Sequence, residues 1–259
     1  MEPIYTLLSA MKGQQRQMDA VANNLANVNT TGFKSDQVMF REYYNQLVGQ
    51  DLESEQELFV NEDFISPYSR GGTSFVIPDH TSPSMKKGIF KNTDSPLDMA
   101  IKSDGFFTVD TVHGARYTRN GQFLLDSKGF LITSSGDKVL GKKGPIQIIV
   151  KSLKELSVGR DGSVLVNNRP VDTLQIVGFQ EETRLTKLGN SYWAPSHKDQ
   201  KPKPLEVVDV QQGVLEGSNV DAVQEMVNMI NVNRTYEASQ KVMQSIDELD
   251  SDSISIARI

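Results

Sequence analysis

The sequence contains no cysteine, three histidines and a single tryptophan among its 259 residues. Without cysteine, neither disulfide bonds nor thiolate metal sites can form. His80, His113 and His197 lie in turn-like contexts without the spacing of metal ligands, so we expect solvated loop side chains and no metal site. We expect no cofactor either, because the chain lacks a glycine-rich phosphate-binding loop.

Long apolar runs and blocks of like charge are also missing. No stretch approaches the ~20 apolar residues that a membrane helix needs, so we expect no membrane insertion. The first residues lack the basic and then apolar pattern of a cleaved secretory signal. The net charge of −6 is spread along the chain, which disfavours a polyanionic partner such as nucleic acid.

A heptad repeat at the N-terminus is the strongest periodic signal. Its apolar a and d positions are Ile4, Leu7, Met11, Met18, Val21, Leu25 and Val28, with Gln14 as the single polar interruption. The repeat predicts an amphipathic helix with a coiled-coil-like seam. Thr30 and Thr31 should end this helix, with Gly32 in a left-handed conformation after it.

A second, broader apolar stripe near the C-terminus predicts another helix. It comprises Val223, Met226, Val227, Ile230, Tyr236, Val242, Met243, Ile246 and Leu249. Ser218 or Asn219 is suited to cap the start of this helix. A hairpin of the two helices would leave Leu8, Val21, Met229 and Val232 on its outer faces, and that arrangement favours packing against neighbouring chains.

Between the helices the pattern changes to short alternating segments with turn residues between them. We expect strands at 106–109, 116–119, 122–125, 146–150, 163–166 and 173–179. No helical pattern of ten residues interrupts them, so the middle of the chain should be an antiparallel all-β domain. The predicted fold class is therefore α+β.

Four segments follow from these patterns: an N-terminal assembly helix at 1–34, an extended and partly irregular connector at 35–87, the β-domain at 88–210, and a C-terminal assembly helix at 211–259. Within the connector, residues 41–47 have some helical character.

The first helix is unstable by itself. Its seven apolar a and d residues contribute roughly 10–20 kcal/mol if fully buried. Fixing about 25 backbone residues costs roughly 25–50 kcal/mol before helix hydrogen bonds are counted. The helix needs a partner, and the C-terminal stripe is the obvious one within the chain. A simpler alternative is that both helices only dock on the β-domain.

Several motifs, in order, resemble those of the flagellar rod and hook axial proteins. They occupy residues 22–34, 95–101, 104–107, 117–121, 158–162, 213–220 and 225–230. Residues 213–220 (Gly-Val-Leu-Glu-Gly-Ser-Asn-Val) and the turn at 143–146 resemble the proximal-rod branch of that family. Asn23, Asn24 and residues 225–230 resemble the distal-rod branch equally well.

The resemblance implies a structural subunit, not an enzyme. Both terminal helices would lie in an inner tubular layer, with the β-domain outside. The implied partners are copies of the chain itself, other rod and hook axial proteins, and the flagellar type III export apparatus. The implied location is the basal-body rod in the periplasmic space, reached without loss of a signal peptide, where the rod transmits torque from motor to hook.

The candidate assembly residues follow from the two helices. They are the seven a and d residues of the first helix, the asparagines Asn23, Asn24 and Asn27, and Val223, Met226, Val227, Ile230, Tyr236, Met243 and Ile246 of the second. Asparagine favours helices weakly, but its amide can hydrogen-bond across a helix–helix seam and fix its register. Alternatively, these asparagines only mark a fraying helix end.

Other functional classes have weaker support. Ser84 to Lys87 matches an S-x-x-K pattern but lacks the companion motifs of acyl-transfer enzymes. Asp104-Gly105 and Asp161-Gly162 indicate hairpin turns and not calcium ligands. A different class remains open, in which the β-domain binds peptidoglycan or another glycan through Tyr192 and Trp193.

Overall fold

The computed structural model of the chain describes residues 2–44, 74–150, 152–179, 185–189, 191–196, 202–205 and 207–256. The chain divides into two compact units, and each is described by itself. Unit 1 comprises Met1–Leu25, Asp36–Ser82 and Ala222–Ile259, and unit 2 comprises Ala26–Ser35 and Pro83–Asp221. The helices lie at the two ends of the chain and an antiparallel β-rich region lies between them, which confirms the predicted α+β class.

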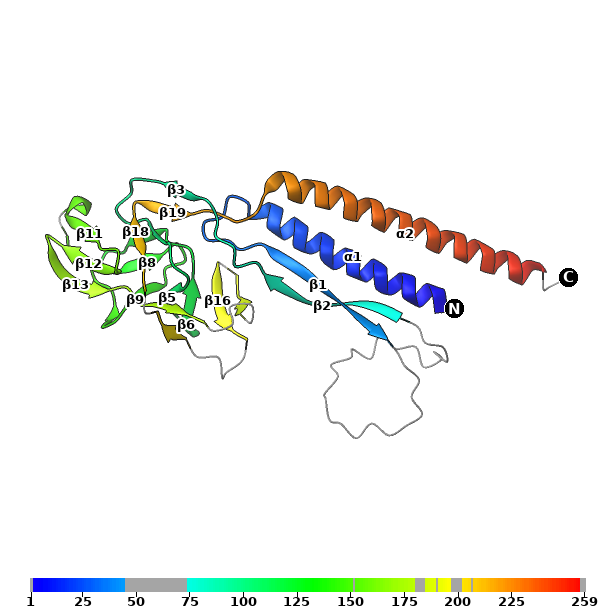
Figure 1. Cartoon of the computed structure of the whole chain (residues 1–259), viewed down its shortest axis with the longest axis horizontal. Helices are drawn as coiled ribbons and strands as arrows, with labels where there is room; N and C mark the ends of the chain where they lie inside the picture. The colour runs from blue at the N-terminus through cyan, green and yellow to red at the C-terminus, as the bar shows by residue number, and fades with distance from the viewer. Residues whose placement is uncertain are drawn as a thin grey trace, which may run out of the picture. The chain divides into compact units, whose positions relative to one another are not determined.

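Unit 1 consists of two helices and a hairpin. Its elements are α1 (Glu2–Ala26), β1 (Asp36–Tyr44), β2 (Ser74–Pro83) and α2 (Ala222–Ile256). Strands β1 and β2 form a two-stranded sheet and run in opposite directions (Figure 1).

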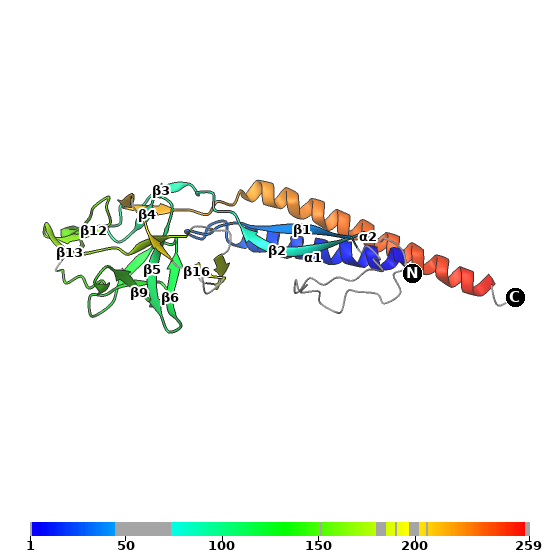
Figure 2. The ribbon, with the colours of Figure 1, turned by 60° about the horizontal axis from the view of Figure 1, so that its bottom comes forward.

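The two helices of unit 1 run antiparallel, side by side (Figures 1 and 2). The Gln14 amide of α1 lies 3.5 Å from the Ser239 hydroxyl of α2. Ten residues later along α1, the Asn24 amide lies 3.5 Å from the Glu225 carboxylate, which is near the start of α2. Contacts therefore move backward along α2 as they move forward along α1.

Helix α1 has two packing sides. On the heptad side, Met11 and Val21 are buried and none of the other a and d residues is exposed. The second side carries small residues, including the buried Ser9 and Gly13. A Cβ on Gly13 would lie 3.1 Å from the Phe40 ring of β1, so the glycine lets the hairpin pack closely on the helix.

Three expectations for unit 1 and its borders were wrong. Helix α1 ends at Ala26, before the threonines, although Gly32 does have a positive φ of 68°. Residues 41–44 belong to strand β1, in keeping with the two tyrosines of that segment, and residues 45–47 lie outside the described residues. Val21 and Val232, expected on outer faces, are buried.

Unit 2 is built from short strands. They are β3 (Phe90–Asn92), β4 (Met99–Ile101), β5 (Phe106–Thr111), β6 (Gly114–Thr118), β7 (Phe123–Leu125), β8 (Leu131–Thr133), β9 (Lys138–Gly141), β10 (Gly144–Pro145), β11 (Leu156–Val158), β12 (Ser163–Val166), β13 (Arg169–Thr173), β14 (Ile176–Gly178), β15 (Leu185–Lys187), β16 (Tyr192–Pro195), β17 (Lys203–Pro204), β18 (Val210–Gln212) and β19 (Val214–Glu216). A 3₁₀ turn, η2 (Leu153–Glu155), precedes β11.

All described strand pairs of unit 2 are antiparallel, as predicted. The main sheet has the order β15-β16-β6-β5-β9-β8-β7, and β14 also pairs with β5. Strands β11, β12 and β13 form a second sheet, while β18 pairs with β4 and β19 pairs with β3. The last two pairs join the segment before α2 to the first strands of unit 2.

Two boundaries in this region differ from the sequence prediction. Residues 146–150 form no strand: Ile146 and Ile148 are buried and Ile149 is exposed, but only Gln147 makes a β-bridge, to Phe130. The β region also extends past residue 210 through β18 and β19, so the C-terminal helix begins at Ala222 and not near 211.

The core of unit 2 has two hydrophobic clusters. One includes Phe107 and Phe123, whose ring centroids lie 5.1 Å apart. The other includes Phe106 and Trp193. Trp193 is 1% exposed and Tyr192 is also buried, so this pair belongs to the interior and cannot line a surface groove for a glycan.

Neither described helix is long and apolar enough to cross a membrane.

Candidate assembly surface and stem joint

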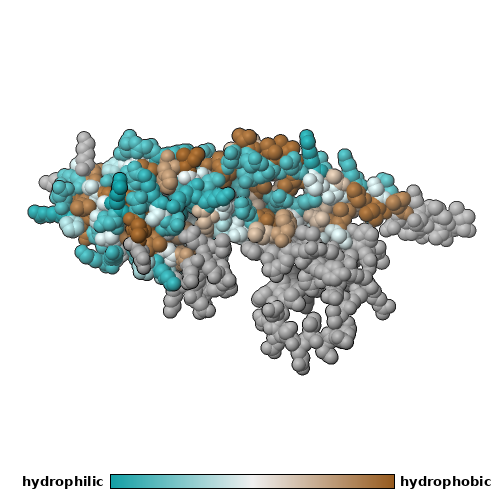
Figure 3. Space-filling view, in the orientation of Figure 1, coloured by the Kyte–Doolittle hydropathy of each residue, from teal (hydrophilic) through white to brown (hydrophobic). Residues whose placement is uncertain are grey.

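The start of α2 carries an exposed apolar surface. Val223, Met226, Val227 and Ile230 are 67%, 46%, 45% and 52% exposed. Their spacing of three and four residues places them on one side of the helix, and we call them the outer stripe. Figure 3 shows hydrophobic residues gathered along the first turns of α2.

The opposite side of α2 is also apolar but is turned toward the rest of unit 1. Val232 is buried, and Met229, Tyr236, Met243 and Ile246 are half-buried. At 3.6 residues per turn these residues lie about half a turn away from the outer stripe. The structure thus separates the predicted α2 residues into the exposed outer stripe and an inner set (Tyr236, Met243 and Ile246).

The apolar surface stops after Ile230. The same side of α2 continues with Arg234, Glu237 and Lys241, all of them exposed. Alternating charges three and four residues apart are typical of a solvated helix face. The outer stripe is therefore confined to the first turns of the helix.

The three asparagines of α1 and its end have different surroundings. Asn24 is 2% exposed, and its amide bonds both backbone groups of Asp36: the Asp36 N–H donates to Asn24 Oδ1 (2.8 Å), and Asn24 Nδ2 donates to the Asp36 carbonyl (3.0 Å). Asn24 therefore holds the start of β1 against α1 within the same chain. Asn27 accepts a hydrogen bond from the Thr30 hydroxyl (3.0 Å), and Asn23 is exposed.

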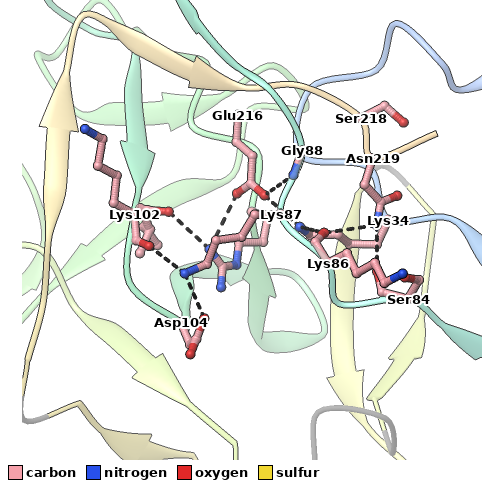
Figure 4. Close-up of polar contacts among 12 residues, drawn as sticks. Lys34, Ser84, Lys86, Lys87, Gly88, Lys102, Asp104, Glu216, Ser218 and Asn219 are labelled. Carbon is pink, nitrogen blue, oxygen red and sulfur yellow. Dashed lines mark hydrogen bonds and ion pairs between the residues drawn. The ribbon is translucent and has the colours of Figure 1, made fainter. Parts of the chain in front are cut away.

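A buried polar cluster lies in unit 2, where three backbone segments meet (Figure 4). The segments are 32–35, 84–89 and 216–219, and we call the cluster the stem joint. The chain passes between the two units after residues 25, 35, 82 and 221, so three of the four passages lie within three residues of one of these segments.

One carboxylate organises the stem joint. Glu216 is 0% exposed and its Oε1 lies 2.6 Å from Lys34 Nζ, which is itself in a residue only 1% exposed. The same oxygen accepts a hydrogen bond from the Gly88 N–H (3.1 Å). The second oxygen lies 3.5 Å from Arg119 Nη1. Two buried cations thus contact one buried anion, and such an arrangement is costly to break at either end.

Asn219 joins the same three segments through its amide. Its Oδ1 accepts from the Ser35 N–H (2.7 Å), and its Nδ2 donates to the carbonyls of Ser84 (2.8 Å) and Lys86 (3.0 Å). Lys34 Nζ donates to the Lys86 carbonyl as well (2.8 Å). The amide therefore crosslinks backbone segments that lie outside the regular sheet ladders.

Two glycines allow the segments of the stem joint to approach. A Cβ on Gly88 would lie 2.0 Å from the Gly217 carbonyl oxygen. A Cβ on Gly32 would lie 2.5 Å from the backbone of Arg119 and Asn120. Any side chain at either position would push the backbones apart.

The sequence prediction missed the stem joint. Lys34, Arg119, Glu216 and Asn219 all lie within motifs recognised in the sequence, at residues 22–34, 117–121 and 213–220. The motifs could have drawn attention to these residues, but nothing in the sequence pairs Lys34 with a carboxylate 182 positions later.

Acidic and histidine side chains of the described residues do not gather into a metal site. These residues contain no group of three or more His, Asp or Glu side chains able to hold a metal ion. His113 is exposed. Hydrogen bonds from Ser163 lower the pKa of Asp161, and they belong to the turn between β11 and β12. This carboxylate therefore shapes a hairpin, as predicted.

Three family models match the chain in the order of its elements. Residues 4–34 match the flagella basal body rod protein model, residues 100–166 match the flagellar hook protein FlgE/F/G D1 domain, and residues 211–256 match the flagellar basal body rod FlgEFG protein C-terminal model. The first covers most of α1 together with Lys34, and the last contains Glu216, Asn219 and the outer stripe.

Curated relatives match over nearly the whole chain. The flagellar basal-body rod protein FlgG of Bacillus subtilis is 30% identical over 267 residues, covering 98% of each chain. FlgF of Caulobacter vibrioides is 32% identical over 247 residues (95% of this chain and 94% of the relative), and FlgF of Mesorhizobium japonicum is 30% identical over 243 residues (93% and 92%). These relatives are structural proteins and not enzymes.

Proposed function

Because this chain belongs to the family of flagellar basal-body rod proteins, we propose that it is a rod subunit that polymerises through its terminal helices. The outer stripe carries the proposal. It is the exposed apolar part of a helix whose opposite side already packs within the chain, and it lies in the segment matched by the C-terminal rod model.

The size of the outer stripe suits a repeating assembly. Full burial of one such side chain contributes about 1.5–3 kcal/mol, and these side chains are already about half-buried, so the four together contribute roughly 3–6 kcal/mol. One contact of that strength gives a dissociation constant no better than about 0.04 mM. The subunit would thus join firmly only where several neighbours contact it together.

The remaining assembly residues form the inner part of the same proposed layer. The a and d residues of α1, with Tyr236, Met243 and Ile246, would hold α1 and α2 as a coiled-coil-like pair. That pair would present the outer stripe to copies of the chain or to related rod and hook subunits. Asn23 is exposed on α1.

We assign the subunit to the proximal rod, as a protein of the FlgF type. The support is the Gly213 to Val220 segment, which resembles the proximal-rod version of this motif. A distal-rod subunit of the FlgG type is the alternative, since relatives of both names match. The test is the order of assembly: deletion of the gene should stop the addition of distal-rod subunits, whereas basal bodies that retain the distal rod would overturn the assignment.

The proposal includes the route and the site of action. The subunit would be exported by the flagellar type III apparatus without loss of a signal peptide, and would act in the rod within the periplasmic space. There it would form part of the shaft that transmits torque from motor to hook.

Polymerisation of the full chain tests the outer stripe. Light scattering should rise with protein concentration for the unmodified chain and for Val242→Ser, because Val242 lies off the stripe. It should stay low for Ile230→Ser. The two positions are matched, with exposures of 52% and 51%. Equal polymerisation of the two variants would exclude the outer stripe as the assembly surface.

A further inference from the structure

The stem joint lies on the path of any force that passes through unit 2 between the two terminal helices. Force arriving from α1 enters unit 2 at Ala26, and force leaving toward α2 exits at Asp221. Between these points the chain makes a loop of more than 180 residues, and most of that loop forms the β core.

The stem joint closes this loop next to its ends. Backbone bonds connect Gly32 N–H to the Glu216 carbonyl (2.8 Å) and Asn219 N–H to the Phe33 carbonyl (3.4 Å). Side-chain bonds connect Lys34 to Glu216 and Ser35 to Asn219. The entry segment is thus bonded directly to the exit segment, and the strands between them are bypassed.

We propose that the stem joint is a mechanical clamp. It carries tension directly between the entry segment (32–35) and the exit segment (216–219), so that the β core bears no load until the clamp opens. The buried charges suit this role. Glu216, Lys34 and Arg119 are each at most 4% exposed, so water cannot readily replace a bond that stretches. Asn219 also bonds the segment that follows the β1–β2 hairpin, through the carbonyls of Ser84 and Lys86.

The purpose of such a clamp rests on the proposed function, because a rod under torque loads its subunits through their helices. The existence of the clamp does not rest on that function, because the force needed to open the clamp can be measured on the isolated chain. Failure of the chain to polymerise and failure of the clamp are therefore separate results.

The chain is suited to a force measurement because it has no native cysteine. Cysteines introduced at Ala26 and Asp221, both exposed, allow handles to be attached at the entry and exit of unit 2. Opening of the clamp followed by unfolding releases the 182 residue steps from Lys34 to Glu216, or about 600–650 Å of extended chain. We expect a single high-force rupture before this release.

Lys34→Met is the test variant and Lys87→Met is its matched control. Lys87 also contacts a carboxylate, that of Asp104 at 3.1 Å. This pair is exposed and does not connect the entry segment to the exit segment. At equal load the clamp should open at least about tenfold faster in Lys34→Met, because a buried ion pair loses one member. It should open at an unchanged rate in Lys87→Met.

A second pulling geometry separates a clamp from general destabilisation. With handles at Val112 (97% exposed, in the β5–β6 turn) and at Ile149 (80% exposed), both attachment points lie in the β core between Lys34 and Glu216, so the force is not applied through the entry or the exit segment. Lys34→Met should then change the opening rate much less than in the first geometry. An equal change in both geometries, or no change in the first, would overturn the proposal.

Discussion

The charge of Glu216 should matter more to unit 2 than any other charge in the stem joint. Glu216→Gln keeps the size and shape of the side chain but removes the only anion that contacts Lys34 and Arg119 among the described residues. Both cations then remain buried and lose this counter-charge. Breaking a buried ion pair at one end costs about 3–5 kcal/mol, and this carboxylate is fully buried.

The assay is urea unfolding followed by tryptophan fluorescence. Trp193 is the single tryptophan, is 1% exposed, and lies in unit 2 with Lys187 Nζ 5.5 Å from its ring centroid, so its emission reports on this unit. With a urea dependence of about 2 kcal/mol per molar, the loss corresponds to a midpoint lower by about 1.5–2.5 M.

The ranking of variants is the sharper result. Lys34→Met leaves Glu216 with Arg119 and the Gly88 N–H, so we expect a smaller loss of about 1–3 kcal/mol. Lys87→Met removes an exposed ion pair and an exposed hydrogen bond to the Lys102 carbonyl (2.7 Å), and should cost less than about 1 kcal/mol. Adding Lys34→Met to Glu216→Gln should recover part of the stability, because it removes one of the two buried cations that lost their contact with the carboxylate. A Glu216→Gln variant less destabilised than Lys34→Met would refute the reasoning.

Three further predictions concern other parts of the chain. Gly88→Ala should lower the stability of unit 2 by about 2 kcal/mol or more in the same urea assay, because its methyl group would overlap the backbone at Gly217. Asn24→Leu should raise hydrogen exchange at the Asp36 amide at least about tenfold while exchange in unit 2 stays unchanged, because it removes two backbone contacts in unit 1. Burial and the hydrogen bond to Asp137 raise the pKa of Tyr192 above 10.0, so the unfolded chain releases this proton first. Unit 2 should therefore lose stability as the pH rises past 10, and Tyr192→Phe should flatten that loss in alkaline unfolding curves.

The sequence predicted the two helices because their apolar residues recur with helical spacing. It predicted the antiparallel middle region from short alternating segments separated by turn residues. The β1–β2 hairpin was missed, since its close packing on α1 depends on Gly13, which carries no signal in an apolar pattern. The end of α1 was placed too late because asparagines and threonines fit both a last helical turn and a following loop.

The interface residues show what periodicity leaves open. A helical repeat identifies an apolar side but not the partner that covers it. Val223 and Ile230 were grouped with Met243 on one stripe, yet the first two are exposed and Met243 faces the interior of unit 1. The ion pairs of the stem joint could not be predicted at all, because charge alone does not specify which lysine and which glutamate meet in the fold.

The pairing of β19 with β3, and of β18 with β4, makes closure of unit 2 a late event in folding. These pairs join residues more than one hundred positions apart, and such contacts form slowly because a long loop must first be ordered. A chain that emerges N-terminus first can assemble most of its β strands but cannot close them until Glu216 and Asn219 have appeared. Unit 2 can therefore close only when the segment directly before α2 has emerged. The outer stripe emerges next, at a time when unit 2 has just become able to fold completely.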